Sequence, residues 1–396
     1  METAKQLLNR LGQWEYIWVV VLVLVTLSMH FSIITEPNEL IFDEQHYVTD
    51  ARSILQEDGT LLYEHPPLGK LFIVSGIFLF GDNPLGWRFF SILFGTIGIV
   101  LFYLVCRQLA MPRSTSSLAA SLLALENLSF IQASVAMLDV YSLTFMLGCF
   151  WLYLKGHYPL AGVLLGLSAL AKLSGALALP VILLHWLLGR RDRYRQFAGL
   201  ALLAPASFLL LMLPFDFIAF RESVNLIDRV RDMLSLSGNL TFATTTFSYI
   251  SRPWEWILHL EAMPYWYQPH YIGVISFTIW ILIIPSVLYM LFRAVKGCNA
   301  SIFGVSWFVG SYLLWIPVSL ITDRISFVYY FYPTVGAICI GLGLGLARLI
   351  NIWETKSAGK FSWIAILTVP VYLSLHIGVL IILSPLSIWG TVPFLE

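Results

Sequence analysis

Two adjacent acidic residues stand in the most polar stretch of this chain, residues 35–72, which follows a long apolar run. Asp43 and Glu44 are closely followed by His46 and Tyr47. A carboxylate in such a setting can take a proton from a hydroxyl group, which is the task of a general base. The alternative is an ordinary acidic loop, and the Asp-Glu pair alone does not distinguish the two.

The composition indicates an integral membrane protein. Of the 396 residues, 58% are hydrophobic and only 12% are charged, and the mean hydropathy of +0.80 lies above the range of soluble globular domains. Lysine plus arginine and aspartate plus glutamate both number 23, so the net charge gives no sign of a nucleic-acid partner. The four cysteines show no spacing typical of a disulfide framework or a metal site, and we expect neither.

About eleven apolar runs are long enough to cross a hydrocarbon core of roughly 30 Å. They cover residues 16–34, 86–106, 116–136, 139–154, 158–172, 174–188, 197–215, 271–292, 301–321, 326–349 and 361–385. The first run lacks a small-residue cleavage pattern, so we expect a retained helix, with a signal peptide as the alternative. Residues 68–80 are apolar but short and follow two prolines, so we expect a helix at the membrane interface.

The distribution of charge predicts the side of the membrane on which each loop lies. With the amino terminus in the cytoplasm, most basic residues, including the cluster at 190–195, fall inside and most acidic residues outside, as the positive-inside rule requires. The expected organisation is one transmembrane domain over residues 1–396 without a separate soluble domain. Its outer loops cover 35–85 and 216–270. This topology predicts a multi-pass protein of the cell membrane whose acidic first loop is extracytoplasmic.

The second outer loop ends in an aromatic cluster at residues 263–267. Tryptophan and tyrosine beside a span are typical of the aromatic belt at a membrane interface. A platform for a sugar or a lipid is the alternative.

Several charged residues lie within or at the ends of the apolar runs, namely Arg88, Glu126, Asp139, Lys172 and Arg324. A charge near the middle of a span costs about 2.5–3.5 kcal/mol on insertion scales, so such residues are usually paired or face water. In the expected topology all of them lie toward the outer ends of their spans. We therefore expect a shared polar cavity that opens outward, with mutual pairing for fold specificity as the alternative.

The residue types in such a cavity suit the transfer of a group from a lipid phosphate. Asp43 leads the carboxylates that could accept a proton, and the cations that could hold a phosphate are Arg88, Lys172, Arg324 and Lys70. A phosphate leaves as a stable anion and needs no general acid, so one carboxylate acting on an incoming hydroxyl would suffice. The cations would stabilise the developing negative charge in place of a metal ion.

The chain also carries a series of motifs in a fixed order. They are Phe-Asp-Glu-Gln-His-Tyr at 42–47, His-Pro-Pro-Leu-Gly-Lys at 65–70, Trp-Arg-Phe-Phe-Ser at 87–91, Met-Leu-Asp at 137–139 and Arg-Ile-Ser-Phe-Val-Tyr-Tyr at 324–330. Together they resemble the motifs of the polyprenyl-phosphate-mannose protein O-mannosyltransferases. This resemblance implies an all-α polytopic protein of the GT-C glycosyltransferase fold, with interfacial helices in its first outer loop.

The resemblance also implies a reaction and the residues that perform it. The donor would be a mannosyl phosphate on a polyprenyl or dolichyl lipid, and the acceptor a Ser or Thr hydroxyl of an exported protein. Transfer would proceed with inversion and without an obligatory metal or other cofactor. Asp43 matches the catalytic acidic residue of the family, Glu44 its neighbour in acceptor binding, and Arg88 and Arg324 the arginines of later motifs. The other pocket residues implied are His46, Tyr47, His65, Lys70, Glu126, Asn127, Asp139, Lys172 and Tyr329.

The chain departs from the family pattern at three places. Leu173 stands where tryptophan is usual after the lysine, Glu126-Asn127 replaces the common Asp-Asn, and Ala133-Ser134 replaces a Ser-Arg pair, so one expected cation is missing. These departures leave the sugar and the acceptor open.

Three other functions stay as alternatives. Aminoarabinose and similar lipid-phosphate sugar transferases share the architecture and would act on a lipid or a cell-wall glycan. A secondary transporter is disfavoured because no inverted repeat is visible and the charges gather at one face. A subunit with an inactive site is the third.

Overall fold

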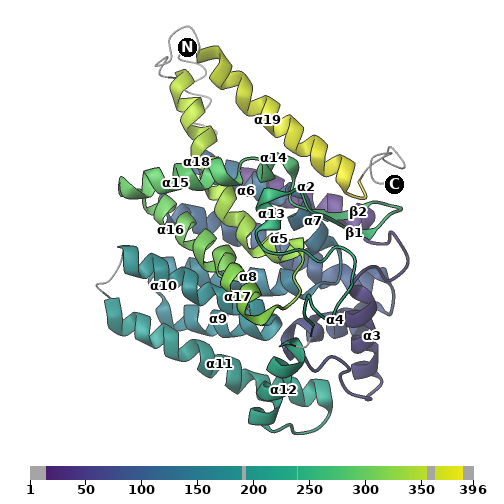
Figure 1. Ribbon diagram of the computed structural model, residues 1–396. Helices are drawn as coiled ribbons and strands as arrows, with labels where there is room; N and C mark the ends of the chain where they lie inside the picture. The colour runs from purple at the N-terminus through teal and green to yellow at the C-terminus, as the bar shows by residue number, and fades with distance from the viewer. Residues whose placement is uncertain (1–14, 190–192, 239, 355–361, 387–396) are drawn as a thin grey trace.

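The computed structural model describes residues 15–189, 193–238, 240–354 and 362–386 (Figure 1). Within these ranges the chain is mostly helical, which confirms the expected all-α membrane architecture. Among the described residues, five helices are long and apolar enough to cross a membrane, or six if one sharply bent pair is counted as a single span. This criterion does not confirm the expected number of about eleven spans, which stays a prediction.

Most of the expected apolar runs are helices. They form α2 (Glu15–Ile33), α5 (Pro84–Gln108), α8 (Leu138–Lys155), α9 (Tyr158–Ala171), α10 (Ala178–Gly189), α11 (Tyr194–Phe220), α16 (Asn299–Phe308), α18 (Tyr332–Glu354) and α19 (Ser362–Leu383). Short 3-10 helices precede two of them, η1 (Leu173–Leu177) before α10 and η4 (Val328–Phe331) before α18. A π-helical segment, η3 (Val309–Leu313), joins α16 to α17 (Trp315–Thr322). Residue 361 of the last expected run lies outside the described residues.

The first outer loop folds into two helices, α3 (Glu44–Leu55) and α4 (Pro67–Phe80). The helix expected at 68–80 is thus present, and it begins at Pro67 because proline is tolerated in the first helical turn. The start of α3 is less usual. Asp43 occupies the N-cap position, yet its side chain accepts no hydrogen bond from the first turn. The carboxylate of an N-cap aspartate normally accepts hydrogen bonds from those backbone N–H groups. Here it does not, so the carboxylate is available for another role.

The run expected as one span at 116–136 is broken, and that prediction was wrong. The chain instead forms α6 (Arg113–Ala124) and α7 (Asn127–Ser134). Glu126 lies between them and caps α7 through a hydrogen bond from the Ser129 backbone N–H at 2.6 Å. The axes of α7 and α8 are bent by 114°. A buried cap with its own backbone partner starts a new helix, which is why the apolar run does not continue.

The prediction of a single span at 271–292 was also wrong. Its first residues form β2 (Tyr271–Val274), which pairs antiparallel with β1 (Ala262–Trp266). Two helices follow, α14 (Phe277–Trp280) and α15 (Ile283–Val295). Pro285 explains the late start of α15, because a proline lacks the N–H that a helix interior needs and fits only in the first turn.

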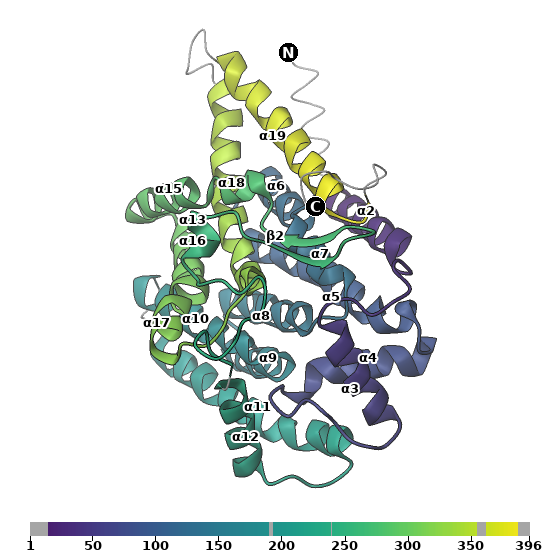
Figure 2. The same cartoon turned by 45° about the vertical axis from the view of Figure 1, so that its right-hand side comes forward.

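Helices α9 and α11 pack with their backbones in close contact and lie side by side in both ribbon views (Figures 1 and 2). Gly162 and Gly166 are spaced as a G-x-x-x-G pair on α9. A Cβ atom at Gly162 would lie 2.8 Å from the carbonyl oxygen of Leu200, and one at Gly166 would lie 2.8 Å from that of Ala204. Small residues in such pairs let helices approach closely in a membrane, so this contact fixes the separation of the two helices.

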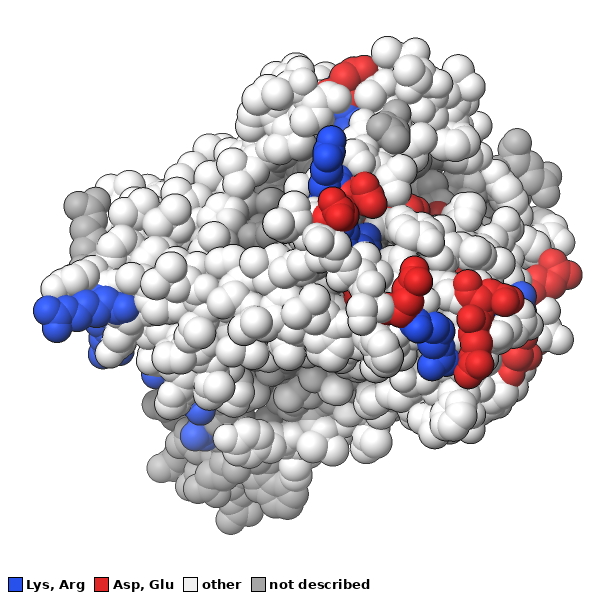
Figure 3. All heavy atoms as spheres, turned by 90° about the horizontal axis from the view of Figure 1, so that it is seen from below, with Lys and Arg blue, Asp and Glu red and all other residues white. Residues whose placement is uncertain are grey.

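Charged side chains are unevenly distributed over the surface. In the space-filling view from below, acidic side chains gather toward one end of the visible face and a basic group stands at the opposite end (Figure 3). This segregation is the pattern that the positive-inside rule describes. The orientation of the chain in the membrane remains a prediction.

Candidate active site

A cavity of about 340 Å³ lies at the junction of the first outer loop, the end of α9, and α17. Its polar lining consists of Glu64, His65, Asp139, Lys172, Arg324, Ser174 and Tyr330. Its apolar lining consists of Leu173, Ala176, Leu177, Leu314, Trp315, Val318 and Pro333. One side therefore offers charge and the other offers hydrocarbon, which is the combination that an amphiphilic ligand requires.

Lys172 and Asp139 form a nearly buried ion pair in this cavity, with Nζ 2.7 Å from Oδ2. Lys172 is placed by the end of α9, where the backbone turns to an extended conformation before η1. Its ammonium group also lies 5.3 Å from the ring centre of Tyr329 and 5.5 Å from that of Tyr330. An ammonium group over aromatic faces is stabilised as a cation, so Lys172 is a fixed positive charge at the cavity wall.

Asp43 is half-buried and is not among the residues that line the cavity, but its carboxyl lies close enough to Lys172 and Asp139 to feel the charge of both. In the part of the chain that the structure describes, its carboxylate makes no hydrogen bond and no ion pair. Burial raises the pKa of Asp43 to about 6, while Lys172 and His46 act in the opposite direction and Asp139 adds to the rise. An unsatisfied carboxylate with a raised pKa is ionised at neutral pH and still basic enough to accept a proton from a hydroxyl.

The backbone before Asp43 is held in an uncommon conformation. Phe42 has φ of +48°, in the left-handed region that non-glycine residues rarely adopt. Its ring is stacked on Tyr265 at 4.2 Å between centroids and meets Tyr329 edge-on at 5.7 Å. These contacts hold the residue in place, and the strained backbone directs the following carboxylate away from its own helix.

Arg324 approaches the cavity from the segment after α17. The second outer loop holds this segment by backbone hydrogen bonds, from Ile325 N to Leu240 O at 3.1 Å and from Phe242 N to Asp323 O at 2.9 Å. Among the described residues, the Arg324 guanidinium makes no hydrogen bond or ion pair. It is therefore a positioned cation whose donors are available to a ligand.

Glu44 and Arg88 pair with each other and are both fully buried. Two hydrogen bonds of 2.8 Å join the guanidinium to the two carboxylate oxygens. Arg88 also donates to backbone carbonyls of the segment between α2 and α3, including that of Ile34 at 3.1 Å, and Glu44 accepts from Ala136 N at 2.9 Å. Because these groups satisfy each other, the pair ties the first outer loop to α5 and α7. Glu44 was predicted to bind the acceptor and Arg88 the phosphate, but the hydrogen-bonding groups of both side chains are already occupied by these contacts.

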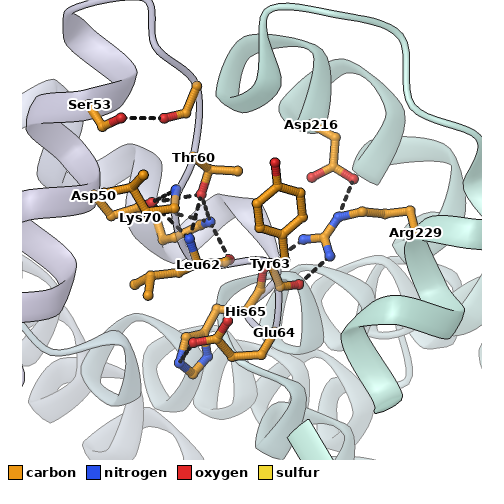
Figure 4. A network of polar contacts seen from close by, with 12 residues as sticks. Asp50, Ser53, Thr60, Leu62, Tyr63, Glu64, His65, Lys70, Asp216 and Arg229 are labelled. Carbon is orange, nitrogen blue, oxygen red and sulfur yellow. Dashed lines mark hydrogen bonds and ion pairs between the residues drawn. The ribbon is translucent and has the colours of Figure 1, made fainter. Parts of the chain in front are cut away.

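The ammonium group of Lys70 is likewise bound within the first outer loop. Its Nζ lies 3.4 Å from Asp50 Oδ2 and donates to Leu62 O at 2.9 Å and to Thr60 Oγ1, all in a buried network (Figure 4). Lys70 is fully buried and does not line the cavity. It shapes the loop that leads to Glu64 and is not itself positioned to touch a ligand.

Arg229 of α12 (Leu226–Gly238) grips the same loop from the opposite side. It pairs with Asp216 at 3.2 Å and donates to the carbonyl oxygens of Tyr63 and, at 2.8 Å, His65 (Figure 4). The two outer loops are thus joined at the segment that carries two of the cavity residues.

The predicted pocket histidines and tyrosines fall into different environments. Burial, together with the positive charge of Lys172, lowers the pKa of His65 well below its usual range, so its ring is neutral and can only hydrogen-bond to a phosphate, not neutralise it. Tyr47 is buried and meets the His65 ring edge-on at 5.4 Å. His46 is exposed. Tyr329 is buried below Lys172 and supports it.

Glu126 and Asn127 anchor the β hairpin. Glu126 accepts from Ser276 N at 2.8 Å, and Asn127 Nδ2 donates to Ile272 O at 2.6 Å. Both side chains are fully buried and neither lines the cavity. They position β1 and β2, and through Tyr265 they support Phe42.

Sequence reasoning did not single out several residues that matter here. Glu64 and Tyr330 line the cavity. Gln132 donates to the Tyr265 hydroxyl at 2.7 Å and orients the ring that stacks on Phe42. The aromatic cluster at 263–267 was the available signal, but Tyr265 of this cluster packs on Phe42 beside Asp43, a contact that neither the interfacial-belt nor the platform interpretation foresaw.

Comparison with known proteins connects this site to a family. Residues 64–216 match the model of the dolichyl-phosphate-mannose-protein mannosyltransferases. The polyprenol-phosphate-mannose–protein mannosyltransferase of Mycolicibacterium smegmatis is 31% identical over 150 residues, which cover 36% of this chain and 29% of that protein. An undecaprenyl phosphate-alpha-4-amino-4-deoxy-L-arabinose arabinosyl transferase of Yersinia enterocolitica is 30% identical over 200 residues, which cover 46% of this chain and 36% of that protein. The matches thus span about a third of these relatives' own length.

The fold extends the likeness over nearly the whole chain. A protein O-mannosyltransferase Pmt1-Pmt2 complex of Saccharomyces cerevisiae, bound to the sugar donor, contains a chain that superposes with a TM-score of 0.73 at 12% identity. The match covers 92% of this chain and 89% of that one. At this identity the likeness shows the fold alone, and it confirms the GT-C architecture that the ordered motifs imply.

Proposed function

We propose that this chain, whose resemblance to the dolichyl-phosphate-mannose-protein mannosyltransferases is confirmed by sequence over residues 64–216 and by fold, is a glycosyltransferase that moves a mannosyl residue from a polyprenyl phosphate to a protein hydroxyl. The observation that carries the proposal is the Asp43 carboxylate, which has no partner among the described residues and feels the charges of Lys172 and Asp139 in a cavity that Arg324 also lines. The relatives, which are polyprenol-phosphate-mannose–protein mannosyltransferases, suggest the mannosyl phosphate donor and the protein acceptor.

The proposed reaction is a single displacement with inversion. Asp43 takes the proton of a Ser or Thr hydroxyl, the acceptor oxygen forms a bond to the anomeric carbon, and the bond from that carbon to the phosphate oxygen breaks. The electron pair leaves with the phosphate, so its negative charge grows in the transition state. Lys172 and Arg324 would stabilise that charge, and a fixed cation in a water-poor cavity does so without reorganisation.

The apolar wall of the cavity fits the lipid part of such a donor. Leu177, Leu314 and Val318 line it, and α17 continues to Leu320 and Ile321, which are 66% and 83% exposed. Large apolar side chains exposed at the end of an apolar helix are stable only against hydrocarbon. An isoprenoid chain could therefore enter sideways from the bilayer and bring its phosphate to Lys172.

Localisation and metal independence belong to the same proposal. We place the chain in the cell membrane with its amino terminus in the cytoplasm and Asp43 on the extracytoplasmic side, on the strength of the charge distribution. We also propose that no divalent metal is obligatory, since the two cations offer the positive charge that the leaving phosphate needs. Activity that survives treatment with a chelator would support this, and activity that divalent ions alone restore would contradict it.

The experiment compares two substitutions in the same loop with purified full-length protein. Asp43→Asn should lower transfer from polyprenyl-phosphate mannose to an acceptor peptide by about 10²–10⁴-fold, the usual contribution of a general base. Asp58→Asn is the matched control, because Asp58 is exposed on the first outer loop. Equal activity of the two variants would remove Asp43 as the base.

A second candidate function rests on the arabinosyl transferase match, which covers more of this chain than the mycobacterial one. In that case the same cavity and base would serve a lipid acceptor with an aminoarabinose donor. Offering one preparation both donors, each with a peptide and with a lipid acceptor, separates the two functions.

A further inference from the structure

A second polar cavity, of about 400 Å³, lies at the far end of α18 from the active site. Its lining consists of Pro112, Ser114, Thr115, Leu118, Arg293, Leu344, Ala347, Arg348, Ile350 and Asn351. Helix α18 begins beside Pro333 of the first cavity and carries Arg348 fifteen residues later, about 22 Å along its axis at 1.5 Å per residue. In both ribbon views α6, α15 and the carboxyl-terminal half of α18 lie together, away from α3 (Figures 1 and 2).

Two arginines supply the charge of this cavity. Arg348 makes no hydrogen bond, ion pair or aromatic contact among the described residues. Arg293 has only long contacts, 3.4 Å to the Tyr289 hydroxyl and 3.9 Å to Cys298 Sγ. The segments that form the walls, 105–118, 290–300 and 340–351, contain no acidic residue. Two guanidinium groups whose wall segments carry no carboxylate favour an anion between them.

The first turn of α6 adds neutral donors to the same cavity. Its N-cap is Pro112, which offers no side-chain acceptor to the N–H groups of that turn. Thr115 lines the cavity and makes no side-chain hydrogen bond among the described residues, and its hydroxyl is not one of the fully buried atoms without a partner, so the cavity can reach it. A ligand with acceptor oxygens would accept hydrogen bonds from this hydroxyl and from the helix N-terminus, where negative charge is favoured.

The surroundings of the cavity are those of a membrane surface. On α15, next to Arg293, the side chains of Leu288, Phe292 and Val295 are 60%, 56% and 90% exposed. Such a face is stable against acyl chains and unstable against water. Basic pockets between membrane helices are suited to anionic lipid headgroups.

We propose that this cavity binds the phosphate group of an anionic ligand, held by Arg293 and Arg348 and by the first turn of α6. The phosphate could arrive on a membrane lipid or as the free ion. The site is separate from the proposed catalytic one, because its residues approach from the opposite end of α5 and α18.

The test uses the full chain in a neutral detergent and two probes, phosphatidylglycerol and inorganic phosphate, with phosphatidylcholine as the neutral lipid. Binding is measured by native mass spectrometry for the lipids and by isothermal titration for the ion. Loss of both cations in Arg293→Gln/Arg348→Gln should weaken the binding of the anionic probe by at least about tenfold, since each cation removed takes with it a charge-assisted hydrogen bond to the probe.

Two further variants make the result decisive. Lys296→Gln removes the same charge from an exposed position after α15 that does not line the cavity, and it should leave binding within about twofold of wild type. Ala347→Phe keeps both arginines and fills the cavity, so it should also abolish binding. Response to phosphatidylglycerol alone identifies a lipid as the source, and response to inorganic phosphate identifies the free ion. If neither probe binds, or if Lys296→Gln has the same effect as the double variant, the proposal is wrong.

Discussion

Asp43 and Glu44 are neighbours in the chain, yet their carboxylates occupy opposite environments. Glu44 is fully buried and accepts hydrogen bonds from Arg88, Ala136 and Ile41. Asp43 has no such partner in the described part of the chain and carries a raised pKa. Successive residues at a helix start point roughly 100° apart, so one carboxylate turns into the protein and the other stays beside the cavity. One acidic residue builds the loop, and the other remains free to react.

Removing the charge of Glu44 should have the largest effect, and this effect is on the stability of the fold. Glu44→Gln leaves the Arg88 charge buried without its counter-ion, so we expect a loss of about 3–5 kcal/mol in the free energy of unfolding. Thermal unfolding of the purified protein in detergent measures it.

Asp43→Asn is the matched substitution for that measurement. Because burial raises the pKa of Asp43, the folded protein binds this proton more tightly than the unfolded chain does. Stability from this group is therefore present below the unfolded pKa and is lost as the pH rises toward 6. The asparagine variant should be at least as stable as wild type at pH 7, and marked destabilisation would show that Asp43 has a structural partner after all.

The next effect concerns Arg324, whose guanidinium has no partner among the described residues. Arg324→Gln should lower kcat/KM for the lipid-phosphate donor by about 10–100-fold, because one charge-assisted contact to the phosphate contributes about 1.5–3 kcal/mol. Arg324→Lys should recover part of the activity, since it restores the charge without the planar fork. Unchanged kinetics with glutamine would assign the phosphate to Lys172 without help from Arg324.

The acid limb of the activity profile sharpens the assignment of Asp43. With a pKa of about 6, the carboxylate is protonated and inactive as a base at lower pH. We expect kcat/KM to be level above pH 7 and to fall about tenfold per pH unit below the pKa. A profile that stays flat down to pH 5 would contradict the raised pKa.

The smallest effect is expected from changing Tyr265, the residue that packs on Phe42. Tyr265→Phe keeps the ring that stacks on Phe42 but removes the hydroxyl that Gln132 binds. The cost should be about 1 kcal/mol of stability with little change in activity. Tyr265→Leu removes the stacking as well, so a fall in kcat for leucine only would show that the aromatic contact positions Asp43.

The apolar runs and the motif residues were readable from the sequence, because hydropathy and residue type are local properties. The two failures, at 116–136 and 271–292, have local causes of another kind. Glu126 caps a new helix, and Pro285 delays the start of α15. A hydropathy window averages over such single residues and so misses the break.

The pairing of charges could not be read from the sequence. The expectation of one shared cavity and the alternative of mutual pairing each describe part of the result. Arg88 and Glu126 are satisfied within the fold, whereas Lys172, Asp139 and Arg324 meet at the cavity. Residue type was the same in both groups, and the course of the chain between distant segments decided that the Lys172–Asp139 pair lies at a cavity while the Arg88–Glu44 pair lies in the protein interior.

The backbone contact between α9 and α11 has a consequence for the chemistry. Lys172 follows Gly166 by six residues, about 9 Å along the helix axis. A methyl group at Gly166 would push α9 away from α11 and tilt α9. The ammonium group of Lys172, at the end of α9, would move with it. The position of a charged group in the proposed active site therefore depends partly on a glycine that has no side chain and packs closely against α11.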